Sequence, residues 1–193
     1  MPTGGLGDSS RPPISLKDGT RVHVRPIRPD DEPRLVHLYE RLSHDTRYQR
    51  FFSVMQRLPT DWAHFLANVD YKRRFALVVE ASGDPALIAV GRYEPSGHDP
   101  TVAELAVVVQ DGWQGRGIGR VLMDGLLREA ASHGITRFRA YVLGDNRRML
   151  QLLRRYTDVV EQRTERGVVD LLLSAREHGA GGGGPFEARH VNQ

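Results

Sequence analysis

The hydrophobic positions of this chain repeat with two different periods, which indicates a mixture of strands and helices. Apolar residues at every second position predict strands, and apolar residues spaced three and four apart predict helices. Strands are expected over residues 20–27, 75–81, 87–93, 101–109, 137–143, 159–163 and 168–174. Helices are expected from residue 29 onward and over residues 60–68, 116–133 and 146–156, with Thr60 as a plausible N-cap. Because three strands follow one another between helices, a purely parallel doubly wound sheet is excluded and a mixed α/β fold is predicted.

Glycine is concentrated at the two ends of the chain. Eight of the 20 glycines lie before residue 8 or after residue 178, and these segments hold too few apolar residues to offset the entropy of ordering them. We therefore predict a disordered tail over residues 1–13 and a flexible, glycine-rich tail over residues 178–193. Residues 14–177 between them are expected to form one folded domain.

Composition and charge remove several classes of function. Lys and Arg number 27 and Asp and Glu 24, so the net charge is only +3; the arginines are dispersed, and a nucleic-acid partner is not expected. The absence of cysteine excludes disulfides, thiolate metal sites and a cysteine nucleophile, and the 8 histidines show no metal-ligand spacing, so no metal is expected. No apolar run approaches the ~18 residues of a membrane span, and no secretory signal pattern opens the chain. A cytoplasmic protein without a membrane partner is predicted.

A glycine-rich turn between a buried strand and the clearest helix is the most informative segment. Glycines at positions 115, 117 and 119 leave room for an anion to approach the backbone, and the helix that follows presents unpaired N–H groups and the positive end of its dipole. Arg116 and Arg120 offer side-chain charge to a phosphate. A Walker loop is unlikely because no Gly-Lys-Ser/Thr follows, and the G-x-G-x-x-G spacing of dinucleotide sites is absent. The pattern predicts a site for a phosphorylated ligand.

These residues also carry a resemblance to a known family. Gln114-Gly115-Arg116-Gly117-Ile118-Gly119 resembles the Q/R-x-x-G-x-G/A motif of the GNAT superfamily of N-acetyltransferases, in which it binds the pyrophosphate of acetyl-CoA. Residues 24–52 and 103–123 and the helix starting at Asn146 look like the catalytic domain of bacterial protein-lysine acetyltransferases. The resemblance implies the GNAT fold, a mixed and mostly antiparallel sheet of about seven strands flanked by about four helices.

The resemblance also implies which residues hold the cosubstrate, acetyl-CoA. Backbone groups of Val107 and Val109 are expected to contact the pantetheine arm where their strand separates from its neighbour. Asn146 is expected either to touch the cofactor or to cap its helix, and the two roles are compatible. The pyrophosphate is expected on the motif and the residue after it: Gln114, Gly115, Arg116, Gly117, Ile118, Gly119 and Arg120.

Glu104 is the candidate general base. It is the lone ionisable group in an apolar strand that leads to the glycine turn, and burial there is expected to raise the pKa of its carboxylate toward a useful range. A lysine ammonium, with an unperturbed pKa of about 10.4, must lose a proton before it attacks a thioester. The alternative is a structural ion pair or a solvated strand residue. The tyrosine that many GNAT enzymes use to protonate the departing thiolate is replaced by Leu153, and Tyr156 is expected in the core.

Several functions are compatible with these sequence features. The leading hypothesis is transfer of acetyl from acetyl-CoA to a protein lysine, with a CoA-ligase-type enzyme as one candidate protein substrate. Acetylation of a small amine (an amino sugar, a polyamine or an amino acid) and a non-catalytic CoA-binding regulatory module are the alternatives, because acceptor choice lies in variable loops. Tyr48, Phe51 and Phe52 either line an acceptor groove or anchor a loop to the core.

Overall fold

The computed structural model describes residues 12–53 and 55–176. Its strands are β1 (Ile14–Ser15), β2 (Arg21–Pro26), β3 (Phe75–Ala81), β4 (Leu87–Pro95), β5 (Val102–Val109), β6 (Arg137–Leu143), β7 (Thr157–Glu165) and β8 (Val168–Ala175). Its helices are α1 (Glu32–Glu40), α2 (His44–Phe51), α3 (Thr60–Ala67), α4 (Ile118–Ser132) and α5 (Arg147–Tyr156), with short 3-10 turns η1 (Pro29–Asp31) and η2 (Asp111–Trp113).

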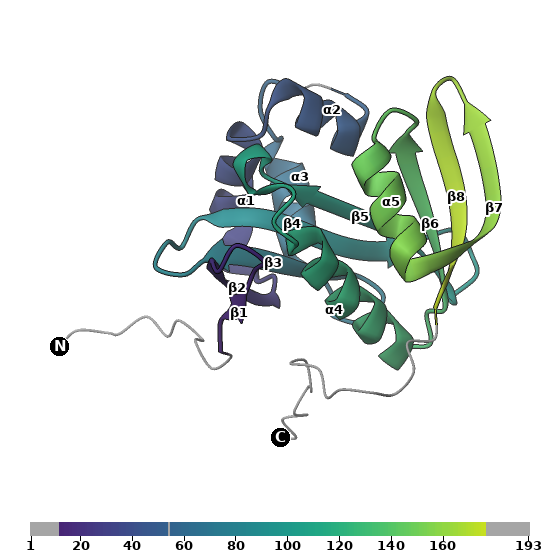
Figure 1. Ribbon diagram of the computed structural model, residues 1–193, viewed down its shortest axis with the longest axis horizontal. Coiled ribbons are helices and arrows are strands. Elements are labelled where there is room, and N and C mark those ends of the chain that lie inside the picture. Colours follow the sequence, from purple (N-terminus) through teal and green to yellow (C-terminus); the bar gives the residue numbers. More distant parts are fainter. Residues whose placement is uncertain (1–11, 54, 177–193) are drawn as a thin grey trace.

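The strands form one sheet in the order β1-β2-β3-β4-β5-β6-β8-β7 (Figure 1). All neighbours are antiparallel except β5 and β6, which run parallel and pair between residues 102–104 and residues 137–139. Beyond Glu104 and Arg139 these two strands diverge, so the middle of the sheet opens into a V. This confirms the mixed, mostly antiparallel sheet, with eight strands and five helices in the described residues rather than about seven and four.

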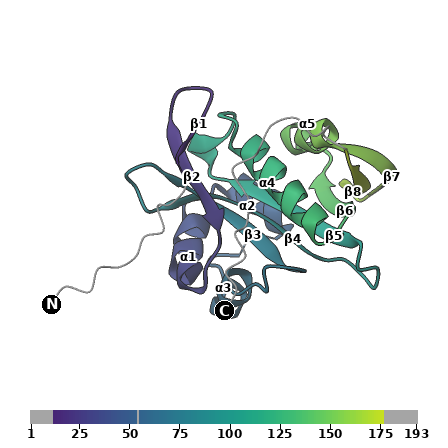
Figure 2. The same ribbon diagram turned by 90° about the horizontal axis from the view of Figure 1, so that it is seen from below.

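Helices cover both faces of the sheet. Helices α4 and α5 lie on one face and α1 and α3 on the other, as Figure 2 shows from the edge of the sheet. The predicted apolar stripe of α4 (Ile118, Leu122, Leu126 and Ala130) is buried in the larger core. Gly91 of β4 allows α4 to pack closely, because a Cβ at that position would lie 2.9 Å from Leu126 Cδ1.

A buried ion-pair network attaches α1 to the sheet. Asp31 is only 1% exposed and accepts hydrogen bonds from both terminal nitrogens of Arg25, each at 2.7 Å, and from Arg34 Nη1 at 2.7 Å. Glu80 of β3 completes the network, since its Oε1 accepts from Arg25 and Arg34 at 2.6 Å each. Asp31, the N-cap of α1, therefore forms structural ion pairs in addition to any effect on the helix dipole.

The structure corrects the predicted elements at several places. Helix α2 and the short strand β1 were not predicted, and the N-cap of α3 is Pro59, with no side-chain capping bond from Thr60. Helix α4 begins at Ile118, two residues after the predicted start. Most of the predicted tails, residues 1–11 and 178–193, lie outside the described residues. Among the described helices, none combines the length and the apolar character needed to cross a bilayer.

Candidate active site

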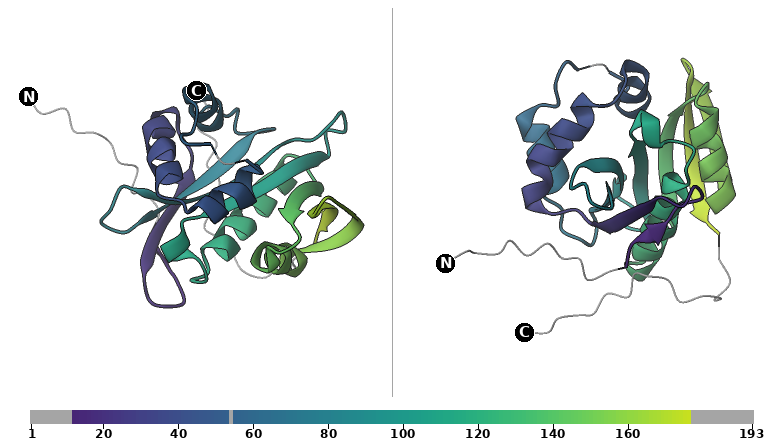
Figure 3. Two further views of the ribbon diagram at one scale, coloured as in Figure 1. Left: turned by 90° about the horizontal axis from the view of Figure 1, so that it is seen from above. Right: turned by 60° about the vertical axis from the view of Figure 1, so that its left-hand side comes forward.

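A cleft of about 810 Å³ opens where β5 and β6 separate. Its walls are β5 from Glu104 onward, β6 from Ala140 to Val142, and parts of α2 and α5. Its floor is the glycine turn and the first residues of α4. Figure 3 shows α2 from above the molecule, at the end of the sheet where β5 enters the turn. The cleft therefore brings Glu104, the glycine turn and Asn146 together, although they come from separate elements.

The glycine turn has the backbone conformation that glycine alone adopts easily. Gly115 and Gly117 have φ values of 78° and 101°, in the left-handed region that a side chain disfavours. Gly117 is the N-cap of α4, so the N–H groups just after it have no earlier helical carbonyl to bind. The backbone N–H of Arg120 is the exception, because it donates to the carbonyl of Gly117 at 3.1 Å. The free donors of an anion cradle therefore lie between residues 115 and 119.

Gly119 has a packing role that the sequence did not indicate. A Cβ on Gly119 would lie 3.0 Å from Leu152 Cδ2 of α5, which is closer than ordinary van der Waals contact. The missing side chain therefore allows α4 and α5 to approach each other. Ile118 is likewise a core residue by its side chain, at 1% exposure, and only its backbone faces the turn.

The two arginines of the turn have different surroundings. The Arg116 guanidinium lies 4.9 Å from the ring centroid of Trp113 and its Nη1 is 3.2 Å from Asp18 Oδ2, so the side chain is not part of the cleft wall. Arg120 does line the cleft, and its Nε lies 3.9 Å from Asp124 Oδ2. Of the two side chains expected to meet a phosphate, that of Arg120 lines the cleft and that of Arg116 does not.

Gln114 joins three walls of the cleft through its side-chain amide. Its Nε2 donates to the carbonyl of Val109 at 3.1 Å and to Thr46 Oγ1 at 3.3 Å, and its Oε1 accepts from Arg148 Nη1 at 3.1 Å. This side chain thus stabilises the cleft from within. Val109 uses its carbonyl in this bond, and the side chain of Val107 is buried in the core, so a contact from Val107 to a pantetheine arm would come from its backbone.

Glu104 lies at the point where the V opens. It faces Glu94 across the antiparallel β4–β5 pair and Arg139 across the parallel β5–β6 pair. Its carboxylate is exposed to the cleft, which corrects the expected burial. Partial loss of water within the cleft raises the pKa of Glu104, the positive charge of Arg50 opposes that rise, and the negative charge of Glu94 adds to it.

Helix α2 supplies cleft residues that sequence reasoning missed. Arg50 lines the cleft, and burial lowers the pKa of its guanidinium while the charges of Glu104 and Glu94 raise it. Asp111 of η2 holds the start of α2 in place by accepting from the Ser43 backbone at 2.9 Å and from the hydroxyls of Ser43 and Thr46 at 2.7 Å each. Ser43, the N-cap of α2, followed by the acidic Asp45 is the sequence signal that could have predicted this helix.

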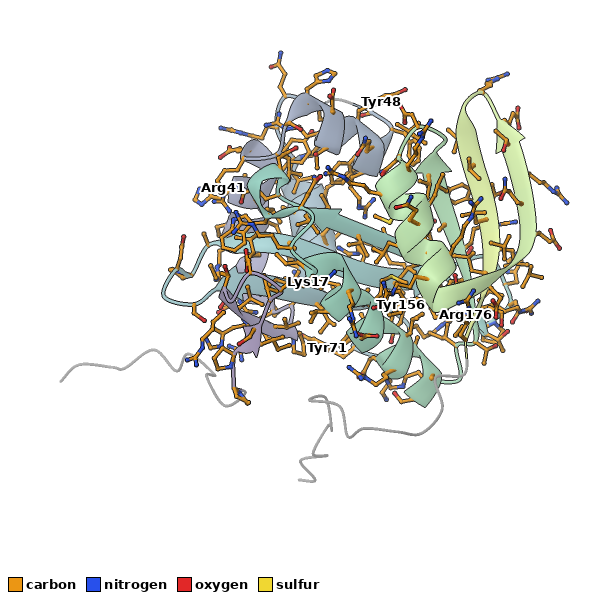
Figure 4. All side chains as sticks on the ribbon, in the orientation of Figure 1. Lys17, Arg41, Tyr48, Tyr71, Tyr156 and Arg176 are labelled. Atoms are coloured by element: carbon orange, nitrogen blue, oxygen red, sulfur yellow. The ribbon has the colours of Figure 1, made fainter. Side chains whose placement is uncertain are left out.

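The aromatic residues at the end of α2 divide between the two expected roles. Phe51 packs edge-on against Tyr39 with ring centroids 5.4 Å apart, as an anchor to the core. Phe52 lines the cleft in a left-handed conformation, with φ at 54°. Tyr48 is exposed, and Figure 4 shows it on the outer side of α2.

Helix α5 closes the remaining side of the cleft. Asn146 caps it, because its Oδ1 accepts from the Met149 backbone at 3.1 Å, while its Nδ2 donates to Gln49 Oε1 of α2 at 3.3 Å. Leu153, which stands where the resemblance to GNAT enzymes would place a tyrosine, is buried at 2% exposure. Tyr156 is buried at 3%, and burial raises the pKa of its hydroxyl. Within the described part of the chain, no cluster of three potential metal ligands is found.

Comparison with known proteins agrees with this geometry. The model of the acetyltransferase (GNAT) family matches residues 30–157. The acetyltransferase Pat of Mycolicibacterium smegmatis is 37% identical over 158 residues, which cover 81% of this chain and 46% of that protein. The crystal structure of the GNAT domain of S. lividans PAT superposes with a TM-score of 0.74 at 32% identity, over 88% of this chain and 99% of that one.

A longer relative has also been solved. The cAMP-binding acyltransferase from Mycobacterium smegmatis has 33% identity and a TM-score of 0.59, over 86% of this chain and 47% of that one. The present chain therefore spans about half the length of these mycobacterial relatives. Because the family model covers most of the fold and the glycine turn lies within it, the chain belongs to the GNAT family of acetyltransferases.

Proposed function

We propose that this protein transfers acetyl from acetyl-CoA to the ε-amine of a protein lysine, with Glu104 as the general base. One observation carries the proposal: a carboxylate with a raised pKa lies where β5 and β6 separate, in a cleft that ends at a glycine turn with free backbone donors. Such a cleft fits a long thioester whose diphosphate is held at one end. The described residues fit this cosubstrate, since Gly115 and Gly117 leave the turn without side chains.

The chemistry requires one base and a positioned thioester. Glu104 accepts a proton from the lysine ammonium, directly or through a water molecule, and the neutral amine attacks the thioester carbonyl carbon. The C–N bond forms, the C–S bond breaks, and a second proton leaves the amine nitrogen for the CoA sulfur. With Leu153 in place of a tyrosine, that proton passes between the reacting atoms or through water.

A protein acceptor is favoured over a small amine by the openness of the cleft at its Glu104 end. Glu104 and Phe52 are both exposed there, which leaves room for a lysine presented by a folded surface. The likeness of residues 24–52 to bacterial protein-lysine acetyltransferases points the same way, and a CoA-ligase-type enzyme is the first protein acceptor to try.

The test is acetyl transfer from labelled acetyl-CoA by the wild-type protein and by Glu104→Gln. We expect turnover of a lysine-bearing protein acceptor to fall about 10²-fold or more in the variant, with unchanged affinity for acetyl-CoA. Glu161→Gln, on the exposed strand β7, is the matched control and should keep full activity.

Three outcomes would contradict the proposal. Undiminished turnover in Glu104→Gln would remove Glu104 from the mechanism. Transfer to polyamines or amino sugars but to no protein would replace the acceptor class. Tight binding of acetyl-CoA without transfer to any amine would leave a CoA-binding module.

A further inference from the structure

The turn between β1 and β2 is a short, well-fixed loop that no motif of the sequence singled out. Leu16 is buried in the main core and its N–H donates to the Thr20 carbonyl at 2.8 Å, while the Asp18 carboxylate accepts from the Thr20 N–H at 3.0 Å. These bonds leave Lys17 exposed at the tip of the turn. Its backbone is therefore held in place although its side chain is in solvent.

This turn is docked against the glycine turn, about 100 positions later in the sequence. Asp18 forms an ion pair of 3.2 Å with Arg116, and a Cβ at Gly117 would lie 3.9 Å from Lys17 Cγ. Lys17 also lines the cleft. Figure 2 shows the β1–β2 turn beside the start of α4, and Figure 4 shows Lys17 at the same place from the front.

The part of the cleft around Lys17 carries positive charge, which favours the binding of an anion. The N-terminal end of α4 carries a partial positive charge, and Arg120, Arg147 and Arg148 line the same cleft. The nearby carboxylate of Asp18 is already paired with Arg116. No described residue forms an ion pair or a hydrogen bond with the Lys17 ammonium. An ammonium that lines the same cleft as other cations and a helix N-terminus adds to the attraction of that cleft for a negative ligand.

We propose that Lys17 binds a phosphate of coenzyme A, so that the β1–β2 turn forms a second wall of the phosphate site opposite the glycine turn. The inference rests on the proposed cosubstrate. In this arrangement the Asp18–Arg116 ion pair positions the turn, and the Lys17 ammonium supplies the charge-assisted contact.

The test is calorimetric titration of acetyl-CoA into the wild-type protein, Lys17→Ala and Lys17→Arg. We expect Kd to rise about tenfold in Lys17→Ala and to change little in Lys17→Arg. Lys72 is the other lysine of the chain, and Lys72→Ala is the matched control because this residue is exposed and not part of the cleft wall.

Truncated cosubstrates identify which phosphate is bound. If Lys17 contacts the 3′-phosphate, the effect of Lys17→Ala disappears with acetyl-dephospho-CoA. If it contacts the diphosphate, the effect persists with acetyl-dephospho-CoA and disappears with S-acetyl-pantetheine. An effect that persists with S-acetyl-pantetheine would overturn the proposal.

Chemical labelling gives a readout that does not depend on activity. Because the chain has two lysines, an amine-reactive acylating reagent followed by peptide mass spectrometry reports each of them separately. Coenzyme A should protect Lys17 and leave Lys72 unchanged. Equal labelling of Lys17 with and without coenzyme A, or wild-type affinity in Lys17→Ala, would overturn the inference alone, whereas failure of the wild-type protein to bind acetyl-CoA would overturn the proposed function with it.

Discussion

At the scale of single residues, the ionisation of Glu104 is set by two neighbours of opposite charge. Arg50 of α2 favours the carboxylate and Glu94 of β4 opposes it, while partial desolvation in the cleft raises the pKa. The other charged residue in register with Glu104, Arg139, has its own partner in Asp170, with Nε and Oδ1 3.1 Å apart. The pKa of Glu104 therefore depends on a residue of α2 and a residue of β4, and neither element belongs to the glycine motif.

This arrangement predicts the acidic limb of the pH–rate profile. Because Glu104 must be ionised to accept a proton, kcat/KM should fall as the pH drops through its raised pKa. Arg50→Gln removes the stabilising charge and should move the limb to higher pH, whereas Glu94→Gln should move it to lower pH. Arg50→Lys keeps the charge and is the control. Shifts of the same sign in Arg50→Gln and Glu94→Gln would contradict this electrostatic account.

Asp31 is the most buried residue of the ion-pair network that attaches α1 to the sheet. Burial alone would raise the pKa of Asp31, but hydrogen bonds from Arg25 and the Arg28 backbone and the charges of Arg25 and Arg34 hold it below its ordinary value. A depressed native pKa stabilises the fold above the unfolded pKa of about 3.9, and this stabilisation is lost as the pH falls through the native pKa.

Asp31→Asn should therefore lower the free energy of unfolding by on the order of 3 kcal/mol at pH 7, because Arg25 and Arg34 lose their most buried partner and are left with Glu80 alone in this network. The gap between wild-type and variant, measured by urea unfolding, should narrow as the pH is lowered. Asp99→Asn removes an exposed partner of Arg137 and should change stability little. A gap that stays constant from neutral to acidic pH would show that ionisation of Asp31 is not the cause.

At the scale of elements, the glycine turn depends on backbone conformation more than on side chains. Gly117→Ala forces a side chain into the left-handed region at φ 101°, at a cost of about 1–2 kcal/mol, and should weaken acetyl-CoA binding as the cradle distorts. Gly112→Ala is the control, because that position has open space and no positive φ. Urea unfolding measures the change in stability, and calorimetric titration measures the change in affinity for acetyl-CoA. Equal acetyl-CoA affinity in the two variants would argue against the turn as the anion site.

Elements with a strong apolar period were predictable, and those without one were not. Strands β3 and β6 match their predicted bounds, and α4 and α5 match to within two residues, because apolar stripes define them. Helix α2 (HDTRYQRF) has no such stripe; bonds from Ser43 and Thr46 to Asp111 hold its start against η2. No local pattern reveals contacts across more than 50 positions, so Arg50 and its place beside Glu104 could not be predicted.

At the scale of the whole molecule, the site results from one interruption in the sheet. The predicted residues Glu104, Gly115, residues 117–119 and Asn146 line one cleft, which opens because β5 and β6 diverge. Side-chain directions were harder to predict. Arg116 points to Asp18, 98 positions earlier, and Gly119 makes room for Leu152 of α5. Both depend on how distant segments pack, and the family motif alone does not contain that information.

We expect acetyl-CoA to bind in the gap between β5 and β6 with its thioester beside Glu104. A crystal structure of the protein with acetyl-CoA tests this most directly. We expect the diphosphate on the backbone N–H groups of residues 115–119, the pantetheine arm along β5, and the thioester carbonyl facing the Glu104 carboxylate. A diphosphate bound away from the glycine turn, or a thioester out of reach of Glu104 even through one water molecule, would contradict the account.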